Sequence, residues 1–205
     1  VDQVQTITVR DNTAPTFTKP MDVTIYTDAN CMYDACPVFT GDVTNETDNC
    51  STGLNAVYND VVGNGSCTGT KVITRTWSLS DHCGNAAMNQ IQIITVSDNT
   101  PPVLVTTDMA SPDPGDDPDI NDYACGSSFS FATNIGTCFA TKSITKPVWS
   151  DGCGDLVIRT HSATNGVVLT NGAGIPGFVT GNFPLGTTTV TFTATDCSGN
   201  TSICT

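Results

Sequence analysis

Aspartate and asparagine recur beside cysteine and glycine in four short polar segments, TDNC (47–50), SDHCGN (80–85), SDGC (150–153) and TDCSGN (195–200), and in two DNT tripeptides at 11–13 and 98–100. Carboxylate and amide oxygens are the ligands that Ca²⁺ takes in proteins. Two candidate calcium sets follow: Asp11, Asn12, Asp48 and Asp81, and Asp98, Asn99, Asp151 and Asp196. The alternative needs no ion, because Asp and Asn also bond their own backbone in tight turns, where Gly84 and Gly199 would supply a positive φ.

A further acidic segment, SPDPGDDPDIND, begins at Ser111. Its carboxylates are crowded enough to bind calcium, but their spacing lacks the D-x-D-x-D-G order of an EF-hand loop. A solvated bulge is the alternative for this segment. The candidate ligands here are Asp113, Asp116, Asp117 and Asp119.

Ten cysteines in 205 residues indicate an oxidising, extracellular setting, because a cytosolic redox poise would keep most of them reduced. Zinc is disfavoured, since the sequence contains no C-x-x-C pair and only two histidines, His82 and His161. We therefore expect a disulfide framework.

The net charge argues against nucleic acid and anionic membranes as partners. Twenty acidic residues against seven basic ones give a net charge of -13, which repels nucleic acid and anionic membrane surfaces. No apolar run approaches the roughly 18 residues of a membrane span, so we expect no membrane insertion in this segment. The G-x-S-x-G, H-E-x-x-H and G-x-x-x-x-G-K motifs are missing, and we do not expect an enzyme.

The elements that must position these residues are short strands. Polar residues alternate with apolar or β-branched ones in DVTIYT, KVITRTWSLS, QIQIITV and TTTVTFTATD, and no 3.6-residue pattern is sustained. The sequence therefore predicts an all-β fold.

The chain also repeats itself. VDQVQTITVRDNTAPTF (1–17) returns 87 positions later as MNQIQIITVSDNTPPVL, with nine identities in seventeen. Each copy ends in a DNT-x-P segment typical of a stiff junction between modules. We expect residues 1–12 to be the final strand of a preceding module, 13–99 to form one immunoglobulin-like module and 100–205 a second that lacks its last strand. Two explanations stay open: the chain is a window of a long tandem array, or subunits donate strands head to tail.

Specific segments suggest a family. FPLGTTTVTFTATDCSGNTSICT (183–205) resembles the closing strands of hyalin-repeat (HYR) modules, and TKPVWSDGCG (145–154) resembles a segment upstream in such modules. The first unit resembles related repeats in Bacteroidota cell-surface adhesins, including the SprB-like adhesins of gliding motility. The resemblance implies tandem immunoglobulin-like β-sandwich modules, an extracellular location and a role in adhesion or display.

In a sandwich of this topology the acidic loops project from one pole of each module, beside the incoming linker. We therefore expect the candidate calcium ligands to converge there, and the cysteines at the loop tips to pair. This predicts the disulfides Cys50–Cys83 and Cys153–Cys197. Cys31–Cys67 is expected because the two loops would share the opposite pole, and Cys125–Cys204 because it would join a first strand to its last-strand neighbour. Cys36 and Cys138 are left either free or bonded between modules or chains.

The function expected from the sequence is that of a load-bearing, adhesive segment of an extracellular filament or cell-surface adhesin, rigidified by calcium. Its partners would be neighbouring copies or modules of the same protein and surface glycans. The alternative is a carbohydrate-binding accessory module of a secreted hydrolase. That alternative requires Trp77 and Trp149 to form an exposed aromatic platform for sugars.

Overall fold

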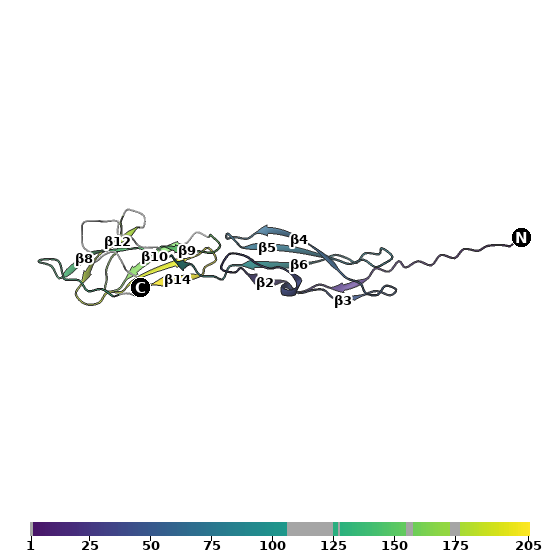
Figure 1. Cartoon of the computed structure of the whole chain (residues 1–205), viewed down its shortest axis with the longest axis horizontal. Helices are drawn as coiled ribbons and strands as arrows, with labels where there is room; N and C mark the ends of the chain where they lie inside the picture. The colour runs from purple at the N-terminus through teal and green to yellow at the C-terminus, as the bar shows by residue number, and fades with distance from the viewer. Residues whose placement is uncertain (1, 106–124, 127, 155–157, 173–176) are drawn as a thin grey trace. The chain divides into compact units, whose positions relative to one another are not determined.

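The computed structural model describes residues 2–105, 125–126, 128–154, 158–172 and 177–205 (Figure 1). Of these residues, 41% are in strands and 2% in a helix, which confirms the all-β, immunoglobulin-like fold class. The chain forms two compact units, Val1–Asp98 (unit 1) and Asn99–Thr205 (unit 2). No helix in the described ranges is long and apolar enough to cross a membrane.

Unit 1 contains two sheets (Figure 1). The larger has the order β2-β6-β5-β4, in which β2 runs parallel to β6 and the other pairs are antiparallel. Its strands are β2 (Val23–Tyr26), β6 (Gln90–Ser97), β5 (Lys71–Ser78) and β4 (Val57–Asn64). The smaller sheet pairs β1 (Thr16–Thr18) with β3 (Thr44–Thr47), and one short helix, α1 (Pro37–Thr40), lies between β2 and β3 in the chain.

The period-2 pattern of β5 sends alternate side chains into the core of unit 1. Trp77 packs with Phe17 and Leu79, while Ile73 packs with Ile94 of β6. A strand with one buried face has its register fixed by this alternation, because a slip of one residue would expose the apolar set.

The same inward face carries a buried cation that the sequence analysis missed. The Arg75 side chain is 1% exposed. It donates through Nε and Nη2 to the Asp60 carboxylate at 2.8 Å each, through Nη1 to Thr40 Oγ1 at 2.8 Å, and through Nη2 to the Ala35 carbonyl at 2.6 Å. Its guanidinium also lies 4.2 Å from the centroid of the Tyr58 ring. Arg75 thus joins β4, β5 and the segment that carries α1.

The described residues of unit 2 form three small sheets, β11-β12-β8, β10-β13-β14 and β7-β9, all antiparallel. The first consists of β11 (Thr170–Asn171), β12 (Phe178–Pro184) and β8 (Phe139–Thr145). The second consists of β10 (Ile158–Ala163), β13 (Val190–Thr195) and β14 (Thr201–Cys204). The third pairs β7 (Val103–Leu104) with β9 (Trp149–Ser150).

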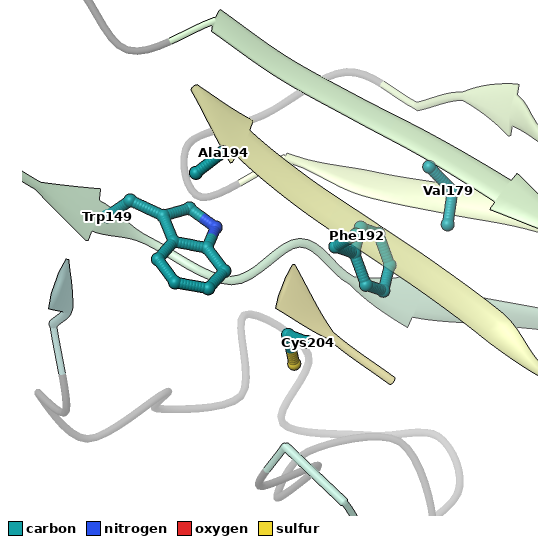
Figure 2. Packing of buried hydrophobic residues seen from close by; sticks show 5 residues of the cluster. All are labelled: Trp149, Val179, Phe192, Ala194 and Cys204. Atoms are coloured by element: carbon teal, nitrogen blue, oxygen red, sulfur yellow. The ribbon is translucent and has the colours of Figure 1, made fainter. Parts of the chain in front are cut away.

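The core of unit 2 gathers around β13, which contributes Phe192 and Ala194. Figure 2 shows these two side chains with Trp149, Val179 and Cys204, which come from β9, β12 and β14. Of the strands in this cluster, β13 is the one that the alternation in TTTVTFTATD predicts.

Residues 2–10 differ from the strand expected there, because they are exposed and belong to no strand. Ile7 and Val9 are 78% and 91% exposed. The chain is held to the body of unit 1 at the end of this segment, where Asn85 Nδ2 donates to the Asp11 carbonyl at 3.2 Å. Alternation and β propensity do not form a strand without a neighbour to bond.

Candidate metal centre

Three loops of unit 1 bring Asp11, Asp48 and Asp81 together. One carboxylate oxygen from each lies within 4.8 Å of the others. Asp11 precedes β1, Asp48 directly follows β3, and Asp81 begins the hairpin between β5 and β6. The convergence expected from the sequence thus occurs for these three residues, which lie 37 and 33 positions apart along the chain.

Asp81 organises its own hairpin. Its Oδ1 accepts from the backbone N–H groups of Cys83 at 2.9 Å and Asn85 at 2.7 Å, and its Oδ2 accepts from Asn85 Nδ2 at 2.7 Å. Gly84 takes the positive φ of 90° that the turn requires. The interpretation as a tight turn is therefore correct for this segment, and the turn fixes where the carboxylate points.

In each of the other two carboxylates, only one of the two oxygens accepts hydrogen bonds from the turn. Asp48 Oδ2 accepts from the N–H groups of Cys50 at 3.0 Å and Ser51 at 2.8 Å, and Asp11 Oδ1 accepts from the N–H of Thr13 at 3.0 Å. The remaining oxygens, Asp48 Oδ1 and Asp11 Oδ2, are buried and accept no hydrogen bond within the described residues. A buried oxygen without a partner costs about 1–3 kcal/mol, and more when it is charged. A cation between the loops would satisfy both.

The surroundings of Asp48 and Asp81 favour the ionised form of these two carboxylates. The N–H groups of Cys50 and Ser51 lower the pKa of Asp48. Burial raises the pKa of Asp81, but the hydrogen bonds from Asn85, Cys83 and Gly84 together lower it below its usual value. Two unit charges about 4 Å apart repel by about 1 kcal/mol in water and several-fold more in a lower dielectric. Close carboxylates of this kind are the donor set that a hard divalent cation prefers.

The other candidate ligands are Asn12 and Asp98 in unit 1, residues of unit 2, and one segment outside the described residues. Asn12 is exposed. Asp98, at the end of unit 1, is 4% exposed and accepts from Thr27 Oγ1 at 3.4 Å. Asn99 is exposed and begins unit 2. The segment with Asp113, Asp116, Asp117 and Asp119 lies outside the described residues.

Within unit 2, two of the candidate ligands hold turns. Asp151 Oδ1 accepts from the N–H of Cys153 at 2.9 Å. Asp196, 2% exposed, accepts from the N–H and Nδ2 of Asn200 at 2.8 Å each, which is the arrangement of Asp81 and Asn85 in unit 1.

Six of the ten cysteines are disulfide-bonded. Cys125 and Cys204 form a disulfide with an S–S distance of 1.97 Å. Every cysteine of the predicted pairs Cys31–Cys67 and Cys153–Cys197 is disulfide-bonded. Cys36 and Cys138, which the sequence could not assign, are free and exposed. These bonds brace both units.

The predicted Cys50–Cys83 disulfide is wrong, because both cysteines are free and exposed. Cys50 Sγ instead accepts from Asn49 Nδ2 at 3.2 Å. The negative charge of Asp11, with burial and the charge of Asp48, raises the pKa of Cys50. The thiolate that must attack to form a disulfide is therefore disfavoured beside this acidic cluster.

Counting the thiols that react with an alkylating reagent tests which cysteines are free. Alkylation of the unfolded, unreduced chain should add four groups, on Cys36, Cys50, Cys83 and Cys138, because these are the free cysteines. Alkylation after reduction should add ten. Intact mass and peptide mapping give the count. Only two groups, with Cys50 and Cys83 both protected, would show that the acidic cluster does not prevent the bond.

The two tryptophans do not form a surface platform. Trp77 is 1% and Trp149 7% exposed, and each packs in the core of its unit. Trp77 Nε1 also donates to Gln92 Oε1 at 3.2 Å, so its polar edge is satisfied internally. The carbohydrate-binding alternative therefore loses the aromatic surface on which it depends.

No known protein-family model matches the chain, and no curated protein sequence matches it. The function must accordingly be argued from the geometry of unit 1 and from the architecture.

Proposed function

We propose that this chain is a structural segment of an extracellular filament or cell-surface adhesin, and that calcium stiffens its modules. Three kinds of observation support the proposal: two all-β units in tandem, a disulfide framework, and the carboxylate cluster of unit 1. Disulfides are typical of proteins in oxidising compartments. Membership of the HYR-like or SprB-like adhesins stays a prediction from the resemblance.

One observation carries the calcium part of the proposal. Asp11, Asp48 and Asp81 place carboxylate oxygens within 4.8 Å, and two of these residues each keep one buried oxygen without a hydrogen bond in the described structure. Turn formation explains the bonded oxygens and leaves the other two unexplained. A divalent cation accounts for them, because it neutralises the repulsion and supplies the missing partner.

The cluster connects three segments, of which the two that flank β1 and β3 are also joined by the pairing of these strands. Asp11 lies at the end of residues 2–12, Asp48 after β3, and Asp81 at the β5–β6 hairpin. A cation held by all three would fix the entry segment to the body of unit 1. In a tandem array, such a clamp limits bending where one module follows another, which is the mechanical role that we propose.

Thermal unfolding tests this function. If the dissociation constant is about 10⁻⁴–10⁻³ M, as in extracellular calcium modules, 10 mM calcium stabilises unit 1 by about 1.4–2.7 kcal/mol. That corresponds to a rise in Tm of about 6–20 °C over the protein in chelator. Asp48→Asn should abolish most of the rise, because it removes a ligand charge and keeps the turn-forming oxygen.

The control is Asp2→Asn, which removes the same charge from an exposed position outside the cluster. It should leave the calcium-dependent rise unchanged. An equal Tm in calcium and chelator, or the same rise in Asp48→Asn as in the unmodified chain, would contradict the calcium site.

A further inference from the structure

The four-stranded sheet of unit 1 has β4 as one of its two edge strands (Figure 1). Residues 2–98 are all described, and among them β4 pairs only with β5. The eight residues of β4, VYNDVVGN, keep one register with β5 and contain no bulge. A long, regular edge strand presents a row of N–H and C=O groups to which another strand can add.

The opposite edge of the same sheet is protected. Its strand, β2, is only four residues long. Pro20 lies before it, together with Lys19 and Asp22, which form an ion pair at 3.0 Å. Short strands, charges and proline are the usual means by which proteins prevent their sheet edges from pairing. β4 is long and contains no proline and no lysine, so it lacks this protection.

β4 exposes apolar side chains on both of its faces. Val61, on the face directed away from the core, is 62% exposed. Val62 lies opposite Ile73 and therefore on the core-facing side, but it is still 53% exposed. A strand laid along β4 would cover part of both side chains, and burial of apolar surface favours association.

The backbone directions of β4 follow from the hairpin that joins it to β5. The N–H of Gly65 donates to the Thr70 carbonyl at 2.9 Å, so the backbone of Gly65 faces β5. Backbone groups alternate in direction along a strand. The residues of β4 whose N–H and C=O groups face the open edge are therefore Tyr58, Asp60, Val62 and Asn64.

The charge of the chain favours β4 as a contact between copies. With a net charge of -13, two copies repel each other over most of their surfaces. The only charged residue of β4 is Asp60, and its carboxylate is bonded to the Arg75 guanidinium. Two copies can therefore approach along β4 without an uncompensated charge on either strand.

Few registers allow two β4 strands to pair antiparallel. Outward-facing residues must lie opposite each other, so that they exchange hydrogen bonds. Placing Asp60 opposite Asp60 of the other copy would bring two carboxylates together, which is destabilising. Placing Asp60 opposite Val62 avoids this and still overlaps residues 58–64, with a two-fold axis at Val61.

We propose that unit 1 pairs with unit 1 of a second copy of this chain through β4, antiparallel, with Asp60 opposite Val62 and Val61 opposite Val61. The two four-stranded sheets then form one continuous sheet. The contact is closed, because each β4 has a single open edge, and its product is a dimer. The inference goes beyond the proposed function, since it requires neither calcium nor a filament.

Sedimentation of the full chain in chelator, from about 1 to 300 µM, tests the proposal. A single strand pair is smaller than the standard interface of about 1,600 Å², so we expect a weak dimer that forms as concentration rises. The exposed free thiols are first blocked by alkylation, so that no disulfide joins two copies. Val61→Lys should weaken the dimer at least about tenfold, because it places two ammonium groups opposite each other.

The matched control is Ile91→Lys. Ile91 is 53% exposed on the same outward face, but it belongs to β6, an interior strand of the sheet. This variant should change the dimer less than about twofold, because charge on an interior strand lies away from the paired edges. Both lysine substitutions replace exposed side chains, so neither should affect folding, which circular dichroism checks.

A second variant acts on the backbone. The N–H of Val62 faces the open edge, so Val62→Pro removes a donor from the proposed contact and none from the pairing with β5. We expect at least about a tenfold weaker dimer from this variant, since proline also obstructs an added strand.

Amide exchange measured by NMR on the associated protein locates the contact. Protection should increase at residues 58, 60, 62 and 64, whereas residues 57, 59, 61 and 63 already face β5. A chain that stays monomeric at about 300 µM, assemblies larger than a dimer, equal effects of the two lysine variants, or association without protection at 58–64 would each overturn the proposal. A calcium-dependent rise in Tm would be unaffected by these results, so failure of the β4 contact and failure of the calcium site are distinguishable.

Discussion

Arg75→Met is expected to lower the free energy of unfolding of unit 1 by about 2–4 kcal/mol, because it leaves the part-buried Asp60 carboxylate and the Ala35 carbonyl without their donor. Arg75 is bonded to Asp60, Thr40 and Ala35, and methionine can replace only its aliphatic volume. The hydrogen bonds from Arg75 to Asp60 also raise the pKa of the guanidinium.

Urea unfolding followed by circular dichroism measures this change. The control is Lys71→Met on the same strand, where the ammonium donates to Asn64 Oδ1 at 2.8 Å in an exposed position. Lys71→Met should cost less than about 1 kcal/mol. Adding Asp60→Asn to Arg75→Met should recover part of the loss, since it removes the charge left behind. A cost below about 1 kcal/mol for Arg75→Met would show that the network does not hold β4, β5 and the α1 segment together.

The second large effect concerns the Cys125–Cys204 disulfide of unit 2. Replacing Cys125 and Cys204 with alanine should lower the stability of unit 2 by about 2–5 kcal/mol. The two residues are 79 positions apart, so the bond closes a long loop and restricts the unfolded chain strongly. Cys204 is also 8% exposed and packs in the core, which adds a packing loss.

The matched control is Cys138→Ala, because Cys138 lies in the same unit and is free and exposed. It should change stability by less than about 0.5 kcal/mol. Denaturation of the double variant and of the control under non-reducing conditions gives both values. Equal stabilities would mean that the loop enclosed by Cys125 and Cys204 is already restricted in the unfolded chain.

The sequence contains enough information to predict several of the strands and the acidic turns. The alternation in KVITRTWSLS and QIQIITV predicts β5 and β6, since period-2 burial is a local property. The D-x-x-G-N segments likewise predict their hairpins, because Asp81 bonds groups only two and four residues away. Local patterns therefore specify the loops that carry the candidate ligands.

Features that depend on distant partners were harder to predict. Arg75 and Gln92 are at core-facing positions of their strands, but the acceptors that make their burial favourable come from residues 35–60 and 21–40. The Cys50–Cys83 pair failed for a related reason. The loops do meet, but which side chains touch depends on rotamers and on the Asp11 charge, and the spacing of residues in the sequence specifies neither.

Residues 2–10 show that an alternating sequence alone does not form a strand. They have the pattern of β6 but form no strand, because a strand is stabilised by the neighbour that bonds it and not by its own sequence.

Calorimetric titration of calcium into the unmodified chain and into Asp48→Asn tests most directly whether the three loops of unit 1 form a cation site. The account predicts that the unmodified chain binds one more ion than the variant, with a dissociation constant of about 10⁻⁴–10⁻³ M. Superimposable isotherms for the two proteins would contradict it.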